Sequence, residues 1–210
     1  MKILLIDNYD SFTYNIVHLF AALPDVEVVV VRNDDDKLAA MMEQQSFDGI
    51  IIGPGPGDPT DPDYFGNNIN IIRTTKLPLL GICLGFQGMA TVYGASLKKA
   101  TEPKHGKTSV FTHSKDSIFS DCPDEFNIMR YHSLMIDANQ NIPNNIEIIG
   151  EVSHNDQSFS ENGREIMALK IKNKPHYGVQ FHPESFASEY GAQIAQNFIN
   201  IIKKSKEASS

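Results

Sequence analysis

The sequence predicts an α/β fold: an open, mostly parallel sheet flanked by helices, with a smaller antiparallel sheet at its edge. Three observations support it. Up to about residue 95, short apolar runs alternate with amphipathic stretches, and strands that alternate with helices build parallel sheets covered on both faces. The apolar runs are also continuous, as expected of strands buried on both sides. Beyond residue 95, strand-like stretches joined by turn-rich links predominate, which indicates antiparallel pairing.

The elements of the first half follow from residue type and spacing. Apolar residues recur at helical spacing in 10–23, where Asp10 or Ser11 is the expected N-cap. The β-branched run at 26–32 favours a strand. We therefore expect strands over 2–6, 26–32, 48–53 and 77–82, and helices over 10–23, 35–45, 64–75 and 84–93.

The second half is expected to pack against the edge of the first sheet. No linker, repeat or low-complexity segment divides the chain, so we expect one domain over residues 1–204 and a frayed tail over 205–210. Helical periodicity returns only near the end of the chain. The expected strands are 107–113, 125–132, 146–154, 164–171 and 176–182, followed by a helix over 191–204.

Composition excludes several classes of protein. The net charge is 18 − 26 = −8, which disfavours a nucleic-acid or anionic membrane surface. The two cysteines form no disulfide framework, and the N-terminus does not resemble a secretory signal. No apolar run approaches the roughly 20 residues that span a bilayer. We expect a cytoplasmic chain with reduced thiols.

The segment G-I-C-L-G, residues 81–85, lies at a predicted strand-to-helix junction. Glycines on both sides of a central side chain permit the sharp, strained turn of a nucleophile elbow. The following helix N-terminus favours a thiolate at Cys83, and the N–H of Leu84 is placed to donate to an oxyanion. A lone cysteine is more often a buried core residue, and we assign that role to Cys122.

The segment H-P-E, residues 182–184, follows the last predicted strand. A thiolate nucleophile needs a base that also protonates the leaving amine, and histidine suits both tasks. A carboxylate that orients the imidazole completes the set, and Pro183 fixes Glu184 relative to His182. Taken singly, the other histidines are more often structural: His18, His105, His113, His132, His154 and His176.

The loop G-P-G-P-G-D-P, residues 53–59, follows the third predicted strand. The N–H groups of Gly55 and Gly57 are free to turn toward a ligand, whereas prolines such as Pro56 set the shape of the loop. Most Gly/Pro loops are plain connections, but ligands of open α/β sheets bind at the carboxyl ends of strands. No phosphate-loop pattern is matched.

Together, in this order, the three segments resemble the class I (triad-type) glutamine amidotransferases, from residue 3 to about residue 200. I-D-N-Y-D-S-F-T-Y-N (6–15), H-G-K (105–107) and R-Y-H-S-L (130–134) resemble the small subunits of anthranilate synthase and aminodeoxychorismate synthase. The resemblance implies L-glutamine as substrate and ammonia delivered to a chorismate-binding large synthase subunit. It implies no metal or organic cofactor in this chain, and Mg²⁺ in the partner.

The resemblance also implies a role for each matching residue. Cys83, His182 and Glu184 are the expected catalytic triad. Segment 6–15 is expected near the partner interface. The residues expected to bind glutamine or form the oxyanion hole are Gly55, Pro56, Gly57, Leu84, Gln87, Ser133 and Leu134.

Two positions depart from the family pattern. Phe86 stands where histidine is common, and Gly53 where serine is common; neither is a triad position.

Three alternative functions stay open for the chain: another amidotransferase, as in guanylate or carbamoyl-phosphate synthesis; a cysteine hydrolase on a similar fold; or a regulatory domain without catalysis. The acceptor product, anthranilate, aminodeoxychorismate or both, is left open.

Overall fold

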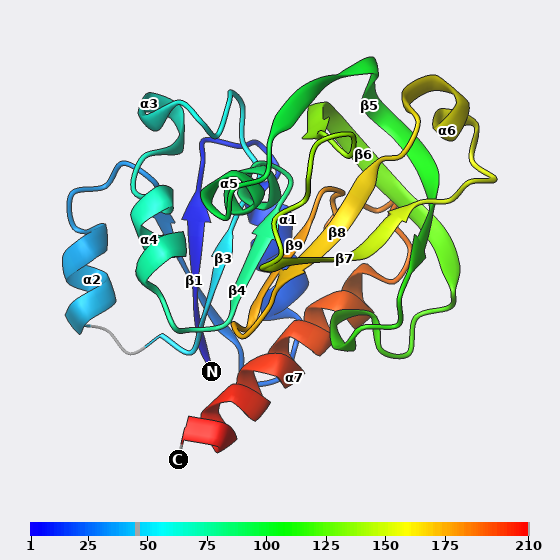
Figure 1. The fold of residues 1–210 in the computed structure, drawn as a ribbon. Coiled ribbons are helices and arrows are strands. Elements are labelled where there is room, and N and C mark those ends of the chain that lie inside the picture. Colours follow the sequence, from blue (N-terminus) through cyan, green and yellow to red (C-terminus); the bar gives the residue numbers. More distant parts are fainter. Residues whose placement is uncertain (45–46, 210) are drawn as a thin grey trace.

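The computed structural model describes residues 1–44 and 47–209. Within them, nine strands form one continuous sheet in the order β2-β1-β3-β4-β9-β8-β7-β5-β6 (Figure 1). The strands are β1 (Lys2–Asp7), β2 (Glu27–Arg32), β3 (Gly49–Ile52), β4 (Leu79–Ile82), β5 (Leu97–His113), β6 (Glu125–Ile136), β7 (Ile146–Val152), β8 (Ile166–Ile171) and β9 (His176–Val179). The helices are α1 (Thr13–Ala21), α2 (Leu38–Gln44), α3 (Pro62–Phe65), α4 (Asn68–Thr74), α5 (Leu84–Val92), α6 (Gln157–Asn162) and α7 (Gly191–Ser209), with a 3-10 turn η1 (Ser117–Phe119).

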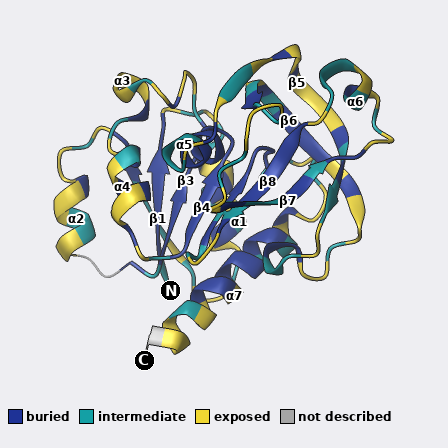
Figure 2. Cartoon of the chain, viewed as in Figure 1, coloured by how far each residue is buried: buried dark blue, intermediate teal, exposed yellow. Residues whose placement is uncertain are grey.

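Strands β2, β1, β3, β4 and β9 run parallel. Because side chains of a strand alternate between faces, β1 contributes to two separate cores. Ile3 and Leu5 pack in the core that includes α1 and α7, whereas Leu4 and Ile6 pack with α2, α4 and α5. Figure 2 shows β1, β3 and β4 buried beneath these helices. The predicted α/β fold class is confirmed.

Strand β9 joins the two halves of the sheet. It pairs in parallel with β4 and antiparallel with β8, and β8, β7, β5 and β6 continue antiparallel. The antiparallel part therefore extends the parallel sheet directly. The long strand β5 starts at Leu97, ahead of the predicted 107–113, and irregular pairing interrupts its register between Lys99 and Lys107.

Several element boundaries differ from the sequence-based expectation. Helix α1 begins at Thr13, with Phe12 at the N-cap and no side-chain cap, so the assignment of Asp10 or Ser11 was wrong. Asp10 instead accepts the N–H of Phe12 at 2.8 Å in a turn before the helix. The helix predicted over 64–75 is interrupted at Gly66, which has φ 53°.

At the C-terminus, α7 remains helical through Ser209, although a frayed tail was expected from residue 205; Ser210 lies outside the described residues. The helix predicted over 35–45 is observed as Leu38–Gln44, and its last predicted position, Gln45, also lies outside them.

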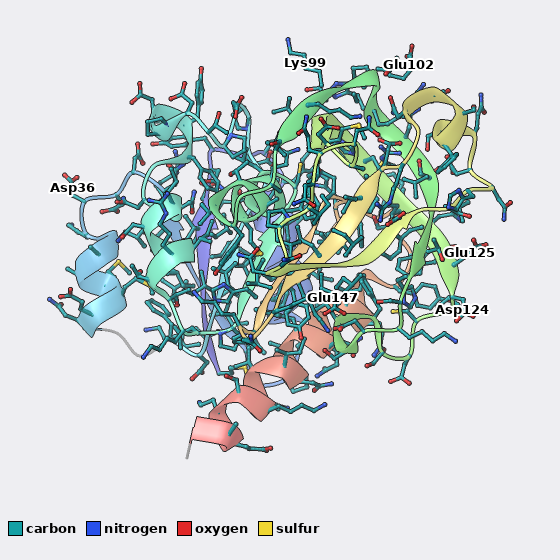
Figure 3. All side chains as sticks on the ribbon, viewed as in Figure 1. Asp36, Lys99, Glu102, Asp124, Glu125 and Glu147 are labelled. Carbon is teal, nitrogen blue, oxygen red and sulfur yellow. The ribbon has the colours of Figure 1, made fainter. Side chains whose placement is uncertain are left out.

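Several charged side chains lie at the periphery of the molecule. Figure 3 labels Asp36, Lys99, Glu102, Asp124 and Glu125, all of which are exposed. Of the helices in the described ranges, none combines the length and apolarity that crossing a membrane would need.

The contact between α1 and α7 supplies a test of the core. Phe198 of α7 is fully buried and its ring meets Phe20 of α1 edge-on, with 6.3 Å between ring centroids. We expect Phe198→Ala to lower the free energy of unfolding by about 3–5 kcal/mol, measured by urea denaturation of the isolated chain. Phe186, which is 99% exposed, is the matched control. Phe186→Ala should change the free energy of unfolding by less than about 0.5 kcal/mol. Equal decreases in the free energy of unfolding for the two variants would contradict the packing of Phe198 against α1.

Candidate active site

Cys83 occupies the turn between β4 and α5. It is the N-cap residue of α5, with φ 53° and ψ −99°, a backbone conformation that is strained for any residue with a side chain. Its N–H donates to the Val179 carbonyl of β9 at 2.9 Å, and its own carbonyl accepts the Gln87 N–H at 3.0 Å. The turn is therefore fixed from both sides, which holds the strained conformation in place.

The two glycines flanking Cys83 are required by close backbone contacts. A Cβ on Gly81 would lie 2.6 Å from the Gly85 backbone, and a Cβ on Gly85 would lie 2.2 Å from the Ile52 carbonyl oxygen. Both separations are shorter than any real Cβ contact, so a side chain at either position would displace α5 from the sheet.

His182 and Glu184 follow β9, the strand next to β4. The Nδ1 of His182 lies 2.6 Å from Oε1 of Glu184, and their side chains are 3% and 1% exposed. The backbone holds the histidine too: its N–H donates to the Met129 carbonyl at 3.0 Å, and Ser188 Oγ donates to its carbonyl at 2.6 Å. Because Glu184 engages Nδ1, Nε2 is the ring nitrogen left to exchange a proton with Cys83.

The charges of this group shift the pKa of His182. Burial opposes the imidazolium, but the negative charges of Cys83 and Glu184 and their hydrogen bonding to the ring outweigh it, so the pKa of His182 lies well above its ordinary value of 6.5. A histidine held beside the sulfur of a cysteine is the arrangement of a nucleophile with its own base.

A pocket of about 180 Å³ opens onto Cys83. Apart from Leu84, the residues expected to bind glutamine or form the oxyanion hole all line it, although they come from a loop, a helix and a strand far apart in the chain. Asn8 anchors the loop, since its Nδ2 donates to the Gly53 carbonyl at 2.8 Å. The lining residues are Gly55, Pro56, Gly57, Cys83, Gln87, His105, Tyr131, His132, Ser133 and Leu134.

Comparison with known proteins identifies the family. The sequence profile of "Glutamine amidotransferase class-I" matches residues 4–202. The chain belongs to this family. Anthranilate synthase component 2 of Leptospira biflexa is 42% identical over 207 residues, which cover 95% of this chain and 100% of that protein. Aminodeoxychorismate synthase of Streptomyces griseus is 38% identical over 204 residues, which cover 97% of this chain but 26% of that protein.

The fold agrees with this assignment. A solved structure of a candidate GMP synthase component from Thermoplasma acidophilum superposes with a TM-score of 0.84 at 27% identity, covering 100% of this chain and 97% of that one. The resemblance seen in the sequence is thus confirmed: the chain is a glutamine amidotransferase of the anthranilate synthase and aminodeoxychorismate synthase type.

The structure adds a residue to this amidotransferase site that the sequence analysis did not single out. Gln180 is fully buried, its Nε2 lies 3.6 Å from Cys83 Sγ, and its Oε1 accepts from Gln87 Nε2 at 3.0 Å. The Gln87 amide nitrogen, expected to serve substrate, also donates to the Leu134 carbonyl at 3.1 Å. Gln180 was missed because its role depends on strand pairing across the sheet.

A second missed feature is a buried polar line leading to Leu134. Arg130, fully buried, pairs with Glu165, and its Nε donates to His132 Nε2 at 3.1 Å. Burial and the charge of Arg130 lower the pKa of His132 to about 3, so this ring is neutral. Because Arg130 can only donate, the His132 proton sits on Nδ1 and is donated to the Leu134 carbonyl at 2.9 Å. The sequence carried a signal for this feature. Residues 130 and 132 are separated from Phe126 by even numbers of residues, so their side chains point to the same buried face of the strand.

Segment 6–15 lies against the triad. The Phe12 ring stacks on Tyr131 with 5.4 Å between centroids, and both rings approach His182, at 6.1 and 5.2 Å. Burial raises the pKa of Asp10, and the neighbouring charge of Glu184 adds to this effect while that of His182 opposes it. The segment therefore borders the catalytic histidine.

The second cysteine lacks the surroundings of Cys83, and no metal site accompanies it in the part of the chain that the structure describes. Cys122 is half-buried, and burial together with the charge of Asp121 raises the pKa of its thiol to about 11, which leaves it protonated and unreactive near neutral pH. In the part of the chain that the structure describes, no group of three or more His, Cys, Asp and Glu residues could hold a metal ion.

The contact between His182 and Glu184 predicts a titration shift. Glu184→Gln removes a negative charge and a charge-assisted hydrogen bond, so the pKa of His182 should fall by about one unit or more, followed by NMR of the imidazole ring. The wild-type ring should thus stay charged to higher pH than the variant ring. Glu189→Gln, at an exposed position nearby, is the control and should leave the midpoint unchanged. The same midpoint in wild type and Glu184→Gln would refute the coupling.

Proposed function

We propose that Cys83, His182 and Glu184 hydrolyse L-glutamine to glutamate and ammonia, and that the ammonia passes to a chorismate-binding synthase subunit. The observation that carries the proposal is Cys83 on a strained turn at the end of β4, beside a histidine whose Nδ1 is held by a buried carboxylate. Nucleophile, base and orienting acid thus occur together at the carboxyl edge of the sheet.

In the first half-reaction, Cys83 Sγ attacks the side-chain amide carbon of glutamine, and the thiol proton goes to His182 Nε2. The C–N bond of the resulting tetrahedral intermediate then breaks. His182 returns the proton to the departing nitrogen, which leaves as ammonia, and a glutamyl thioester remains on Cys83. Glu184 orients the ring and stabilises its charged form throughout.

The oxyanion of the tetrahedral intermediate needs hydrogen-bond donors. Leu84 is the first residue of α5, so its N–H has no partner within the helix and is available. Gly57 or Gly55 of the pocket loop supplies the second N–H, each donor contributing about 3–4 kcal/mol to the barrier reduction. The backbone at Ser133 and Leu134 holds the α-amino and carboxylate groups of glutamine, and Pro56 and Gln87 complete the substrate pocket.

In the second half-reaction, water attacks the thioester with His182 as base. The C–S bond breaks, glutamate leaves and the Cys83 thiol is restored. Each proton in this sequence is carried by His182 or water, so the chain needs no metal or organic cofactor. We assign the Mg²⁺ that the family resemblance implies to the large synthase partner.

Ammonia is mostly ammonium at neutral pH and diffuses freely, so efficient use requires an acceptor docked at the site. Exposed aromatic side chains occur on segments that border the site: segment 6–15, whose Phe12 packs against His182, the segment at Tyr64 that contacts Gly57, and the residues after Glu184. Aromatic side chains are enriched at protein interfaces. They support docking of the chorismate-binding partner beside the pocket. We place the reaction in the cytoplasm, as the composition of the chain indicates. These aromatic residues are Tyr9, Tyr14, Tyr64 and Phe186.

A GMP synthase-type acceptor is the second candidate, favoured by the Thermoplasma structure. Identity with that protein is 27%, against 42% over the whole of the Leptospira component 2. The chorismate-binding acceptor is therefore the better-supported proposal.

The test is glutamate release from glutamine by the purified chain, with and without chorismate and a chorismate-binding synthase subunit. Release should rise with the partner, fall to background in Cys83→Ala and persist in Cys122→Ala, the control. The amino product, anthranilate or aminodeoxychorismate, identifies the acceptor reaction. Undiminished release by Cys83→Ala would refute the catalytic assignment, and stimulation only by a GMP synthase-type acceptor would refute the partner.

A further inference from the structure

Two glutamine side chains connect Cys83 to the strand that borders the pocket. Gln87 Nε2 lies 3.1 Å from the Leu134 carbonyl oxygen and 3.0 Å from Gln180 Oε1. Gln180 Nε2 in turn lies 3.6 Å from Cys83 Sγ. Both side chains are buried, Gln180 fully, so their amide groups have to find partners within the protein.

The direction of each hydrogen bond in this series is fixed by the Leu134 carbonyl. A carbonyl oxygen only accepts, so Gln87 must present its NH₂ group to Leu134 rather than its oxygen. The second hydrogen of that NH₂ group then faces Gln180, which must present its oxygen in reply. The remaining NH₂ group of Gln180 is therefore turned to Cys83.

The Leu134 carbonyl is itself held in place. It also accepts from His132 Nδ1 at 2.9 Å, and the proton is on that nitrogen because Arg130 donates to the other one. Since an arginine cannot reverse its role, Arg130 fixes the proton of His132 on Nδ1, and His132 in turn holds the carbonyl that orients both glutamine amides.

We propose that Gln180 is a further catalytic residue, whose Nε2–H donates to Cys83 Sγ and stabilises the thiolate, and that Gln87 is the positioning residue that turns this amide toward the sulfur. A thiolate is a much stronger acceptor than a thiol, so such a bond favours the charged form. The proposal rests on Cys83 being the nucleophile of the proposed function.

Strand register and burial both support this assignment. β4 and β9 pair Ile82 with Val179, so Cys83 and Gln180 are the next residues along two adjacent parallel strands. A buried amide costs free energy unless its polar atoms are bonded, and an apolar side chain would fill the same space at lower cost. The hydrogen bond to sulfur gives this buried position a chemical use.

The test measures how alkylation of Cys83 by iodoacetamide depends on pH, because only the thiolate reacts. Peptide mass spectrometry separates Cys83 from Cys122. Gln180→Glu keeps an oxygen for Gln87 to bond but places a carboxylate against the sulfur, so the alkylation midpoint should rise by about one pH unit or more. Gln180→Met removes the donor without adding charge, and its midpoint should rise by less.

Gln44→Glu is the control, since it makes the same chemical change at an exposed position at the end of α2. Its midpoint should equal that of the wild type. Gln87→Glu should also raise the midpoint, because a carboxylate at 87 accepts from Gln180 Nε2 and turns the Gln180 oxygen toward Cys83. If Gln180 and Gln87 had only a structural role, their variants would lower the free energy of unfolding without shifting the alkylation midpoints.

A Gln180→Met midpoint equal to that of the wild type would overturn the proposal, because the added carboxylate of Gln180→Glu raises the midpoint whether or not Gln180 donates to Cys83. Glutamate release, measured in parallel, separates the two claims. Shifted midpoints in a chain that releases no glutamate with any partner would support the role of Gln180 while refuting the glutaminase function. Glutamate release together with unshifted midpoints would refute the role of Gln180 while supporting the glutaminase function.

Discussion

The parallel pairing of β4 with β9 is the interaction on which the site depends. These strands are adjacent in the sheet although almost 100 residues separate them in the chain, and four register pairs join them. Cys83 leaves the end of one strand, and Gln180 and His182 leave the end of the other. A slip of one residue would turn Gln180 and His182 to the opposite faces. Catalytic geometry is thus set by backbone register before any side chain contributes.

The register of β9 is itself fixed from its other side. β8 pairs with β9 antiparallel, and the Gln180 N–H donates to the Met167 carbonyl at 2.8 Å. The antiparallel half of the sheet therefore does more than cover the edge of the parallel half. It holds the strand that carries the base, and through β6 it supplies one wall of the pocket.

The buried ion pair of Arg130 and Glu165 carries a desolvation cost behind the wall of the pocket that β6 forms. Removing two charges from water is unfavourable, and apolar residues of similar volume often replace such pairs without loss of stability. Here the pair fixes the tautomer of His132, which in turn holds the Leu134 carbonyl. An apolar replacement would remove the donor to His132 Nε2, so the tautomer that donates to the Leu134 carbonyl would no longer be enforced.

Local features of the chain were predictable and long-range ones were not. The cysteine turn was recognisable because its constraints, Gly81 and Gly85, are neighbours in sequence. The start of α1 was misjudged because tertiary contacts compete with local capping: Thr13 Oγ1 donates to Asp7 of β1 at 2.7 Å, and Asp10 closes its own turn. Gln180 carried no local signal, since its partners Cys83 and Gln87 lie more than 90 residues away.

The proposed mechanism depends on covalent acylation of Cys83 by glutamine. The most direct measurement is rapid acid quenching of the chain during turnover with isotopically labelled glutamine, followed by peptide mass spectrometry. A labelled glutamyl adduct is expected on the Cys83 peptide and none on the Cys122 peptide. Glutamate formation with no adduct at Cys83, or with the adduct at Cys122, would contradict it.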